Sequence, residues 1–144
     1  MEKKEYYLDS CIWLNLFKKE GDSTKGVPFW KLAKDFIDQA GNDEGMVIVS
    51  TIVLKELYFV LGEKFGNVKQ FFKEASFVSL VKTTNDDYNL ARKLERQHQF
   101  LSFYDYLHVA IARRLNVPLI TRDNALIEFA KSHVEVFKPE DLLR

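Results

Sequence analysis

Met46-Val-Ile-Val-Ser-Thr-Ile-Val-Leu-Lys-Glu-Leu57 is the stretch that most directly indicates the fold. Its first four residues are apolar and mostly β-branched, which is typical of a short strand buried on both faces. Ser50 is a favoured N-cap residue, and the apolar residues after it predict a helix that runs to about Leu61 and ends at Gly62. A buried strand followed directly by a helix is the repeating unit of an α/β fold.

The same alternation of strand and helix continues along the chain. Short apolar runs predict further strands at 5–8, 77–81, 119–120 and 134–137. Apolar residues at helical spacing predict helices at 11–18, 28–40, 67–75, 84–97, 102–115 and 124–132. Pro28 suits a first helical position, and Gly41 is expected to end that helix. We expect a polar loop at 22–26 and a tail from 138.

Strands that alternate with helices indicate an α/β fold. We expect a three-layer α/β/α sandwich with a central parallel sheet and right-handed crossovers. With 144 residues, of which 47% are hydrophobic and 14% aromatic, the chain can bury one substantial core. We therefore expect residues 1–144 to form a single domain.

The balance of charge limits the classes of function. The 21 basic and 21 acidic residues give a formal net charge of zero. Tight, non-specific binding of nucleic acid usually needs a strongly basic face, and this composition does not indicate one. An RNA substrate held mainly by a metal ion and a few arginines stays compatible with it.

Cysteine content and hydropathy indicate the compartment. Cys11 is the only cysteine, so it cannot form an internal disulfide, which fits a reducing compartment. The opening residues, Met-Glu-Lys-Lys-Glu, are charged and differ from a signal peptide. The longest apolar stretch, 46–54, is too short to span a bilayer. We expect a soluble cytoplasmic protein with no membrane partner.

Four acidic residues stand at comparable places in this pattern: Asp9, Glu56, Asp105 and Asp123. Two directly follow expected strands, and the other two lie within the first turns of expected helices. In open α/β folds the carboxyl ends of the strands meet at one edge, where ligands bind. Mg²⁺ and Mn²⁺ prefer carboxylate ligands, and such an ion lowers the pKa of bound water and neutralises phosphate charge. The pattern predicts a metal-dependent phosphodiesterase.

Each of these acids also has a structural explanation. Asp9 and Asp123 can cap the helices that follow them, and Asp105 can form a capping box with Ser102. Glu56 can be a solvated helical position. For a single acid this explanation is at least as strong as a catalytic one, so the joint placement of all four is what favours a site.

Four segments that contain these acids resemble, in the same order, the motif blocks of PIN-domain ribonucleases. They are Tyr7-Leu-Asp9-Ser-Cys-Ile-Trp, Ser50-Thr-Ile-Val-Leu-Lys-Glu56-Leu, Asp105-Tyr-Leu-His-Val-Ala-Ile-Ala112 and Pro118-Leu-Ile-Thr-Arg-Asp123. The resemblance runs through essentially the whole chain. It implies a PIN fold, metal binding by the four acids, and Mg²⁺- or Mn²⁺-dependent endonuclease activity on RNA that leaves 5′-phosphate and 3′-hydroxyl ends.

Three further positions are candidates for substrate positioning. Thr121 corresponds to the hydroxyl residue of the family's Thr-x-Asp block, and Ser10 is a weaker candidate beside the first acid. Arg122 can pair with a phosphate through two hydrogen bonds, or it can neutralise nearby acids, and the two readings stay equally open. Ala125 stands where some members have a further Asp, which counts against a second metal ion.

The resemblance also implies partners. In size the chain resembles the toxin members of toxin–antitoxin pairs, which implies a small antitoxin protein and is compatible with a homodimer. The first two expected helices are rich in aromatic residues beyond the needs of a core, which favours an apolar groove for a partner helix or a second copy. These aromatic residues are Trp13, Phe17, Phe29, Trp30 and Phe36.

Other functions remain open at this point. A non-catalytic PIN-like module that binds RNA or a protein would account for Ala125. A phosphotransferase with Asp9 as nucleophile is a weaker alternative, because Cys11 stands where the phosphatase pattern has a second Asp. His108, one helical turn after Asp105, is better explained as a packing residue than as part of a site.

Overall fold

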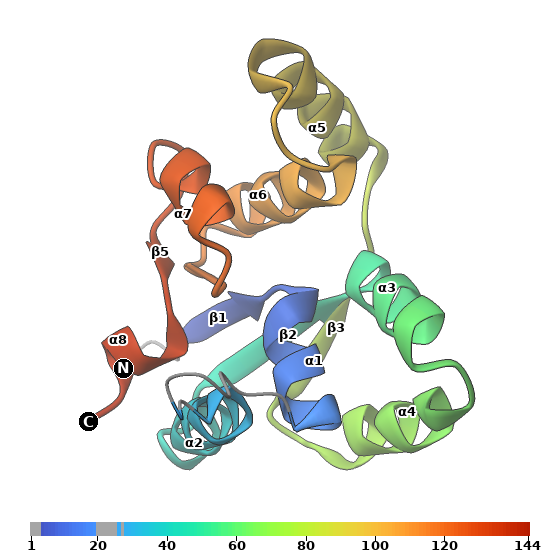
Figure 1. Cartoon of the computed structure of the whole chain (residues 1–144), viewed down its shortest axis with the longest axis vertical. Coiled ribbons are helices and arrows are strands. Elements are labelled where there is room, and N and C mark those ends of the chain that lie inside the picture. The colour runs from blue at the N-terminus through green and yellow to red at the C-terminus, as the bar shows by residue number, and fades with distance from the viewer. Residues whose placement is uncertain (1–3, 20–25, 27) are drawn as a thin grey trace.

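A five-stranded parallel sheet forms the centre of the fold (Figure 1). The computed structural model describes residues 4–19, 26 and 28–144, so the loop expected at 22–26 lies outside the described residues except for Gly26. The strands stand in the order β3-β2-β1-β4-β5. Their bounds are β1 (Glu5–Leu8), β2 (Met46–Ser50), β3 (Val78–Val81), β4 (Leu119–Ile120) and β5 (Val136–Phe137).

Helices follow the strands and flank the sheet, which confirms the predicted α/β/α architecture. In Figure 1, α1 and α2 lie in front of the sheet, α3 and α4 lie on the β3 side, and α5, α6 and α7 lie above it. The helices are α1 (Ser10–Lys18), α2 (Phe29–Asn42), α3 (Thr51–Leu61), α4 (Phe65–Glu74), α5 (Asn85–His98), α6 (Phe103–Leu115), α7 (Asn124–Ala130) and α8 (Pro139–Leu142). A 3-10 turn, Gly62–Lys64, joins α3 to α4.

The first strand lies at the middle of the sheet. It pairs with β2 on one side and with β4 on the other, where Tyr7 is opposite Ile48 and Leu119, respectively. The chain moves from β1 toward β2 and returns only later to β4, so the strand order reverses between β1 and β4. Ligands of open α/β sheets bind at the carboxyl ends of the strands at such a reversal. The fold therefore places Asp9 at the position where a ligand site is expected.

Helix α2 differs from the prediction at its C-terminal end. Gly41 was expected to end the helix, but α2 continues through it to Asn42, and the left-handed backbone conformation falls on Glu44 (φ 59°). Gly41 instead lies against the ring of Phe77, where an added Cβ would come within 3.2 Å of ring carbons. Close packing accounts for this glycine. Pro28, expected at the first helical position, occupies the N-cap.

The short helix α8 was not predicted, because Lys138-Pro139 was interpreted as the start of an irregular tail. Pro139 stands at the first position of this helix, where its missing N–H costs nothing. The Asp141 carboxylate accepts a hydrogen bond from the Lys138 backbone N–H at 3.0 Å and closes the first turn.

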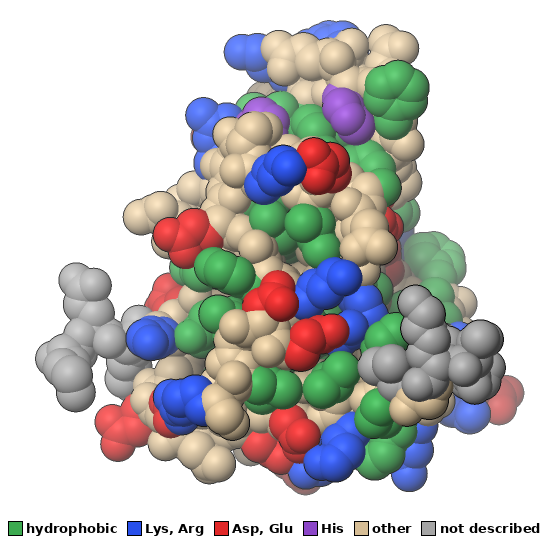
Figure 2. Space-filling view, turned by 60° about the vertical axis from the view of Figure 1, so that its left-hand side comes forward, with side chains coloured by type: hydrophobic (Ala, Val, Ile, Leu, Met, Phe, Trp, Pro, Cys, Tyr) green, Lys and Arg blue, Asp and Glu red, His purple; other side chains and the backbone are tan. Residues whose placement is uncertain are grey.

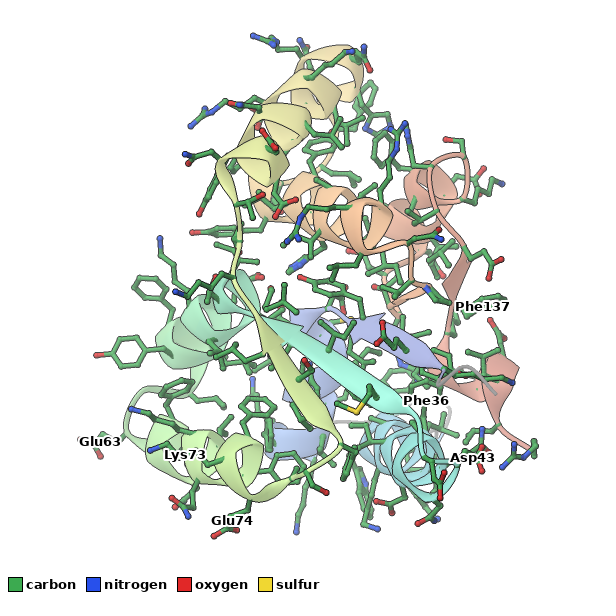
Figure 3. The ribbon with its side chains drawn as sticks, turned by 180° about the vertical axis from the view of Figure 1, so that it is seen from behind. Phe36, Asp43, Glu63, Lys73, Glu74 and Phe137 are labelled. Carbon is green, nitrogen blue, oxygen red and sulfur yellow. The ribbon has the colours of Figure 1, made fainter. Side chains whose placement is uncertain are left out.

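The surface agrees with the balanced composition. Acidic and basic side chains are interspersed on the face shown in Figure 2. Figure 3 shows the opposite side of Figure 1, where β3 and β2 cross in front and Lys73 projects from α4. Within the described residues, no helix combines the length and apolar character needed to cross a membrane.

Candidate active site

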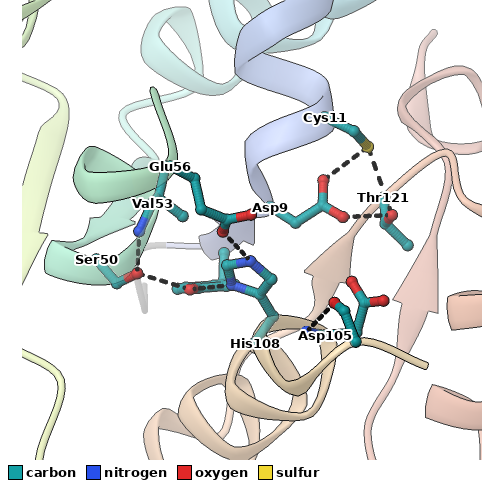
Figure 4. A network of polar contacts seen from close by, with 10 residues as sticks. Asp9, Cys11, Ser50, Val53, Glu56, Asp105, His108 and Thr121 are labelled. Atoms are coloured by element: carbon teal, nitrogen blue, oxygen red, sulfur yellow. Dashed lines mark hydrogen bonds and ion pairs between the residues drawn. The ribbon is translucent and has the colours of Figure 1, made fainter. Parts of the chain in front are cut away.

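Asp9 lies at the end of β1 and is almost fully buried, with 4% of its surface exposed. Its backbone N–H donates to the carbonyl of Ile120, which joins the ends of β1 and β4. Its carboxylate accepts hydrogen bonds from Thr121 Oγ1 at 2.6 Å and from Cys11 Sγ at 2.8 Å (Figure 4). Asp9 also stands at the N-cap of α1, where the Ile12 backbone N–H lowers the pKa of its carboxyl, so a capping role coexists with these side-chain contacts.

Burial controls the protonation of this pair. It raises the pKa of Asp9, although His108 and the hydrogen bonds from Cys11 and Thr121 act in the opposite direction. Burial and the neighbouring Asp9 carboxylate raise the pKa of the Cys11 thiol well above its ordinary value. The thiol therefore stays protonated and serves as a hydrogen-bond donor to Asp9.

Glu56 is held by a chain of polar side chains from three other elements (Figure 4). Its carboxylate accepts from His108 Nε2 at 2.8 Å, and His108 Nδ1 lies 2.7 Å from the Tyr7 hydroxyl. That hydroxyl lies 2.8 Å from Ser50 Oγ, which in turn accepts from the Val53 N–H and caps α3. This series of hydrogen bonds fixes Glu56 relative to β1, β2 and α6.

His108 is buried, yet it has more than a packing role. Burial lowers the pKa of His108, but hydrogen bonding to Glu56 and the charges of Glu56, Asp9 and Asp105 together raise it above the ordinary value. The imidazole thus orients Glu56, and it lowers the pKa of Asp9 and of Asp105 electrostatically. Its spacing from Asp105 in α6 was the only sequence signal of this role.

Asp105 and Asp123 are the other two candidate acids at the carboxyl ends of the strands, and we call this region with its four acids the carboxyl edge. Burial raises the pKa of Asp105, and the charges of Asp123 and Asp9 raise it further, whereas His108 and the Ser102 hydrogen bond lower it. Asp123 is exposed and caps α7, since its Oδ1 accepts from two backbone N–H groups of that helix at 2.9 and 3.1 Å. Capping of α7 is thus confirmed for Asp123, and it coexists with electrostatic contact to Asp105.

The remaining predicted positions divide into two groups. Thr121 is fully buried beside Asp9, and Ser10 is buried as the first residue of α1. Arg122 instead donates to both carboxylate oxygens of Glu140 at 2.8 Å, and its guanidinium lies 4.2 Å from the centre of the Phe29 ring. Of the two readings left open for Arg122, the geometry favours neutralisation of a nearby acid, because a phosphate would have to displace Glu140.

The sequence model of the PIN-domain family matches residues 6–132, a span that contains all four acids. The chain belongs to the PIN-domain family. PIN domains are generally nucleases, so the family fits hydrolysis of a phosphodiester as the chemistry of this edge. No protein of curated function matches the sequence.

Solved structures share the fold of this PIN domain. A chain of a toxin–antitoxin complex from Klebsiella pneumoniae is 19% identical with a TM-score of 0.64, and the match covers 93% of this chain and 97% of that one. A chain of VapBC2 from Rickettsia felis, bound to a DNA fragment from their promoter, is 18% identical with a TM-score of 0.67 and coverages of 93% and 98%. A chain of FitAcB from Neisseria gonorrhoeae is 16% identical with a TM-score of 0.63 and coverages of 95% and 99%.

The donor set of the PIN domain fits a hard divalent cation. All four candidate ligands are carboxylates, the type that Mg²⁺ and Mn²⁺ prefer. Asp9 is buried and Asp105 is half-buried, and the pKa of each is raised. Asp105 is also destabilised as an anion by two neighbouring acids, a conflict that a cation would relieve. In the described ranges, no three His, Cys, Asp or Glu side chains are already gathered to hold a metal ion. Binding would therefore draw the acids closer together than they lie in this structure.

Proposed function

We propose that this PIN domain is a metal-dependent endoribonuclease that hydrolyses RNA phosphodiester bonds and acts as the toxin of a toxin–antitoxin pair. The observation that carries the nuclease proposal is the arrangement at the reversal of strand order. There a buried Asp9, fixed by Thr121, shares one electrostatic environment with Asp105 and Asp123. Carboxylates placed this close repel one another, and such unfavourable clusters are found mainly at functional sites.

Each residue of the edge has a proposed role. Asp9, Glu56, Asp105 and Asp123 would hold Mg²⁺ or Mn²⁺. When bound, the ion would supply the water activation and charge neutralisation that phosphodiester hydrolysis needs. The hydrogen bond from Thr121 keeps Asp9 in one orientation, and Ser10 adds a hydroxyl at the start of α1.

His108 extends this role to the other side of the site. By donating to Glu56, the imidazole keeps that carboxylate directed toward the crevice and balances part of its charge. Arg122 has no part in this proposal, because both terminal nitrogens of its guanidinium donate to the Glu140 carboxylate.

The toxin part of the proposal rests on the similar structures. One of them is described as a toxin–antitoxin complex, and its fold covers nearly all of this chain. We therefore propose a small antitoxin protein as partner, with residence in the cytoplasm, and we retain a homodimer as a possible assembly. Two observations favour the non-catalytic alternative: Ala125 replaces an acid, and the carboxylates are engaged in hydrogen bonds.

Cleavage of a set of end-labelled structured and single-stranded RNAs tests the proposal. Purified protein is incubated with Mg²⁺, with Mn²⁺ and with EDTA, in parallel with Asp9→Asn and Asp105→Asn. Asp38→Asn is the matched control, because Asp38 is a 52% exposed acid on α2. We expect metal-dependent cleavage by the wild type and the control, and rates at least about 100-fold lower in the two site variants.

Two results would contradict the nuclease proposal. Cleavage that survives in EDTA or in both site variants would show that these acids do not perform the chemistry. Absence of cleavage together with RNA binding that is unaffected by Asp9→Asn would instead support the non-catalytic module. Titration calorimetry with Mn²⁺ supplies a readout that does not depend on choosing the right RNA, and we expect Asp9→Asn to lose the binding heat.

A further inference from the structure

An apolar groove of about 490 Å³ lies between α3, α4 and the β2–β3 side of the sheet, elements that Figure 3 shows from behind. Its walls are α3 and α4, and its floor is formed by β2 and β3. Apolar side chains from all four elements line it, including Leu54, Tyr58, Phe65, Phe72, Val78 and Leu80. A groove of this size lies within the range of natural ligand sites.

Two of these side chains are exposed to a degree unusual for large apolar residues. Tyr58 is 58% exposed and Leu80 is 59% exposed, and the Tyr58 ring meets the edge of Phe65 at 5.5 Å. Phe59 and Val60, the next residues of α3, are exposed as well. Contiguous exposed apolar surface of this kind marks an interaction site in a soluble domain.

Much of the aromatic content of the first two expected helices lies in or against the core. Trp13 and Phe17 of α1 pack against Phe71 and Phe72 of α4, with ring centres 4.9 to 6.4 Å apart, so these aromatic residues belong to the interior. Phe36 of α2 is buried. The available apolar surface lies on the other side of α4.

Three lysines surround the groove. Lys69 and Lys73 lie one turn apart on α4, Lys55 lies on α3, and all three line the groove with exposed side chains. In the part of the chain that the structure describes, no carboxylate forms an ion pair with any of them. The groove thus combines an apolar floor with uncompensated positive charge at its rim.

The apolar floor and the lysines at the rim together limit which kind of molecule can bind in the groove. A second copy placed face to face would bring its own lysines against these lysines, and like charges in contact are unfavourable. Nucleic acid would gain from the lysines but would place phosphates and sugars over an apolar floor. Apolar side chains flanked by carboxylates would satisfy both parts of the groove.

We infer that the α3–α4 groove binds an acidic, amphipathic helix of a partner protein. The α3 wall presents Thr51, Leu54, Lys55 and Tyr58, which recur at helical spacing and form one ridge along the groove. Helices bind such grooves through apolar anchors at the same spacing, and acidic residues beside the anchors would pair with the lysines. The inference concerns a protein-binding surface and does not require nuclease activity.

The groove is connected to the carboxyl edge through α3. Lys55 faces the groove, whereas the adjacent Glu56 bonds to His108 in the site. A partner that binds in the groove therefore contacts the helix that carries one of the four acids.

Selection from a displayed library of helical peptides tests the inference. The peptides are about 16 residues long, with apolar residues fixed at i, i+4, i+7 and i+11 and the other positions randomised. They are selected on the immobilised full chain without RNA or metal, so failure here is separate from failure of the nuclease proposal. We expect the enriched peptides to carry Asp and Glu beside the apolar stripe.

Groove variants then locate the binding. We expect the Kd of an enriched peptide, measured by fluorescence anisotropy, to rise about tenfold in Lys69→Glu/Lys73→Glu, and also to rise in Leu80→Asn and Lys55→Ser. Lys93→Glu on α5 and Phe100→Ser, which removes an 85% exposed ring, are matched surface controls and should leave the Kd unchanged. All changes are at exposed positions, and circular dichroism confirms that each variant is folded.

Three outcomes would overturn the inference. One is that no peptide is enriched above the starting library. Another is that the enriched peptides lack acidic residues. The third is that the control variants weaken binding as much as the groove variants do.

Discussion

The Tyr7 hydroxyl is a single group that joins three elements of the site. It lies between Ser50 at the start of α3 and His108 in α6, and all three side chains are buried. Removal of this hydroxyl takes one buried hydrogen-bond partner from Ser50 Oγ and one from His108 Nδ1. We expect Tyr7→Phe to lower the free energy of unfolding by about 1–3 kcal/mol, measured by urea denaturation.

Tyr58→Phe is the matched control for that measurement. It removes a hydroxyl from a side chain that is 58% exposed, so we expect a change within about 0.5 kcal/mol. If Tyr7→Phe were as stable as the wild type, water or a shifted His108 would be satisfying the buried groups, and Glu56 would not depend on this hydroxyl.

Thr121 provides a second test at the scale of one residue. Its hydroxyl donates to Asp9 at 2.6 Å, and its methyl group is buried. Provided that the proposed nuclease activity is present, we expect Thr121→Val to reduce the cleavage rate by about 10- to 100-fold and Thr121→Ser to retain most of it. Equal loss in the two variants would show that packing, and not the hydrogen bond, is what Asp9 requires.

At the scale of elements, the Arg122–Glu140 ion pair holds α8 against the segment between β4 and α7. Burial raises the pKa of Glu140, but the hydrogen bonds and charge of Arg122 outweigh it, so the pKa of the folded carboxyl lies below its ordinary value. A lowered pKa in the folded state contributes stability above the unfolded pKa. That stability is lost as the pH falls through the folded value.

We therefore expect Glu140→Gln to be less stable than the wild type at neutral pH by up to about 1 kcal/mol, because the Glu140 side chain is 35% exposed. In urea denaturation the difference should shrink as the pH falls from the ordinary carboxyl pKa through the lower folded pKa of Glu140, because the wild-type carboxyl then becomes protonated as well. Glu128→Gln, in an exposed pair with Lys131, should show no comparable effect at either pH. A difference that persists in acid would assign the effect to shape and not to charge.

Local chemistry explains which elements were predictable. Helix α5 begins close to its predicted start, where Thr84 and Asp87 form a capping box, and Ser50 and Gly62 delimit α3 as expected. Helix α8 has four residues, too few for a periodic pattern, so its sequence did not distinguish it from a tail. Gly41 lies inside α2 and packs against Phe77, a contact between distant residues that no local pattern contains.

At the scale of the whole molecule, balanced charge limits binding to RNA in general. With a formal net charge of zero and both signs interspersed on the face in Figure 2, few counterions would be released on contact with a phosphate backbone. We expect weak binding of unrelated RNA in EDTA at about 0.15 M salt, with a shallow dependence on salt, measured by filter retention. Tight binding with a steep salt slope would reveal a basic face that the composition does not indicate.

The candidate site was predictable in its acids and not in their supports. The four acids could be proposed because Asp9 and Asp123 follow strands, and Asp105 and Glu56 lie in the first turns of helices. The topology of a parallel sheet brings such positions to one edge. Their supports depend on contacts across 101 residues for Tyr7 and His108, and 112 for Asp9 and Thr121. Such pairs have no periodic signature, and His108 was therefore assigned to packing.

The position of β1 between β2 and β4 also has a consequence during synthesis. The first acid leaves the ribosome early, but its neighbours across the crevice are encoded more than a hundred residues later. A nascent chain that lacks β4 has no second wall at that edge. The proposed catalytic centre therefore stays incomplete while the polypeptide is still tethered to its own messenger, and it assembles only when translation of that message is nearly finished.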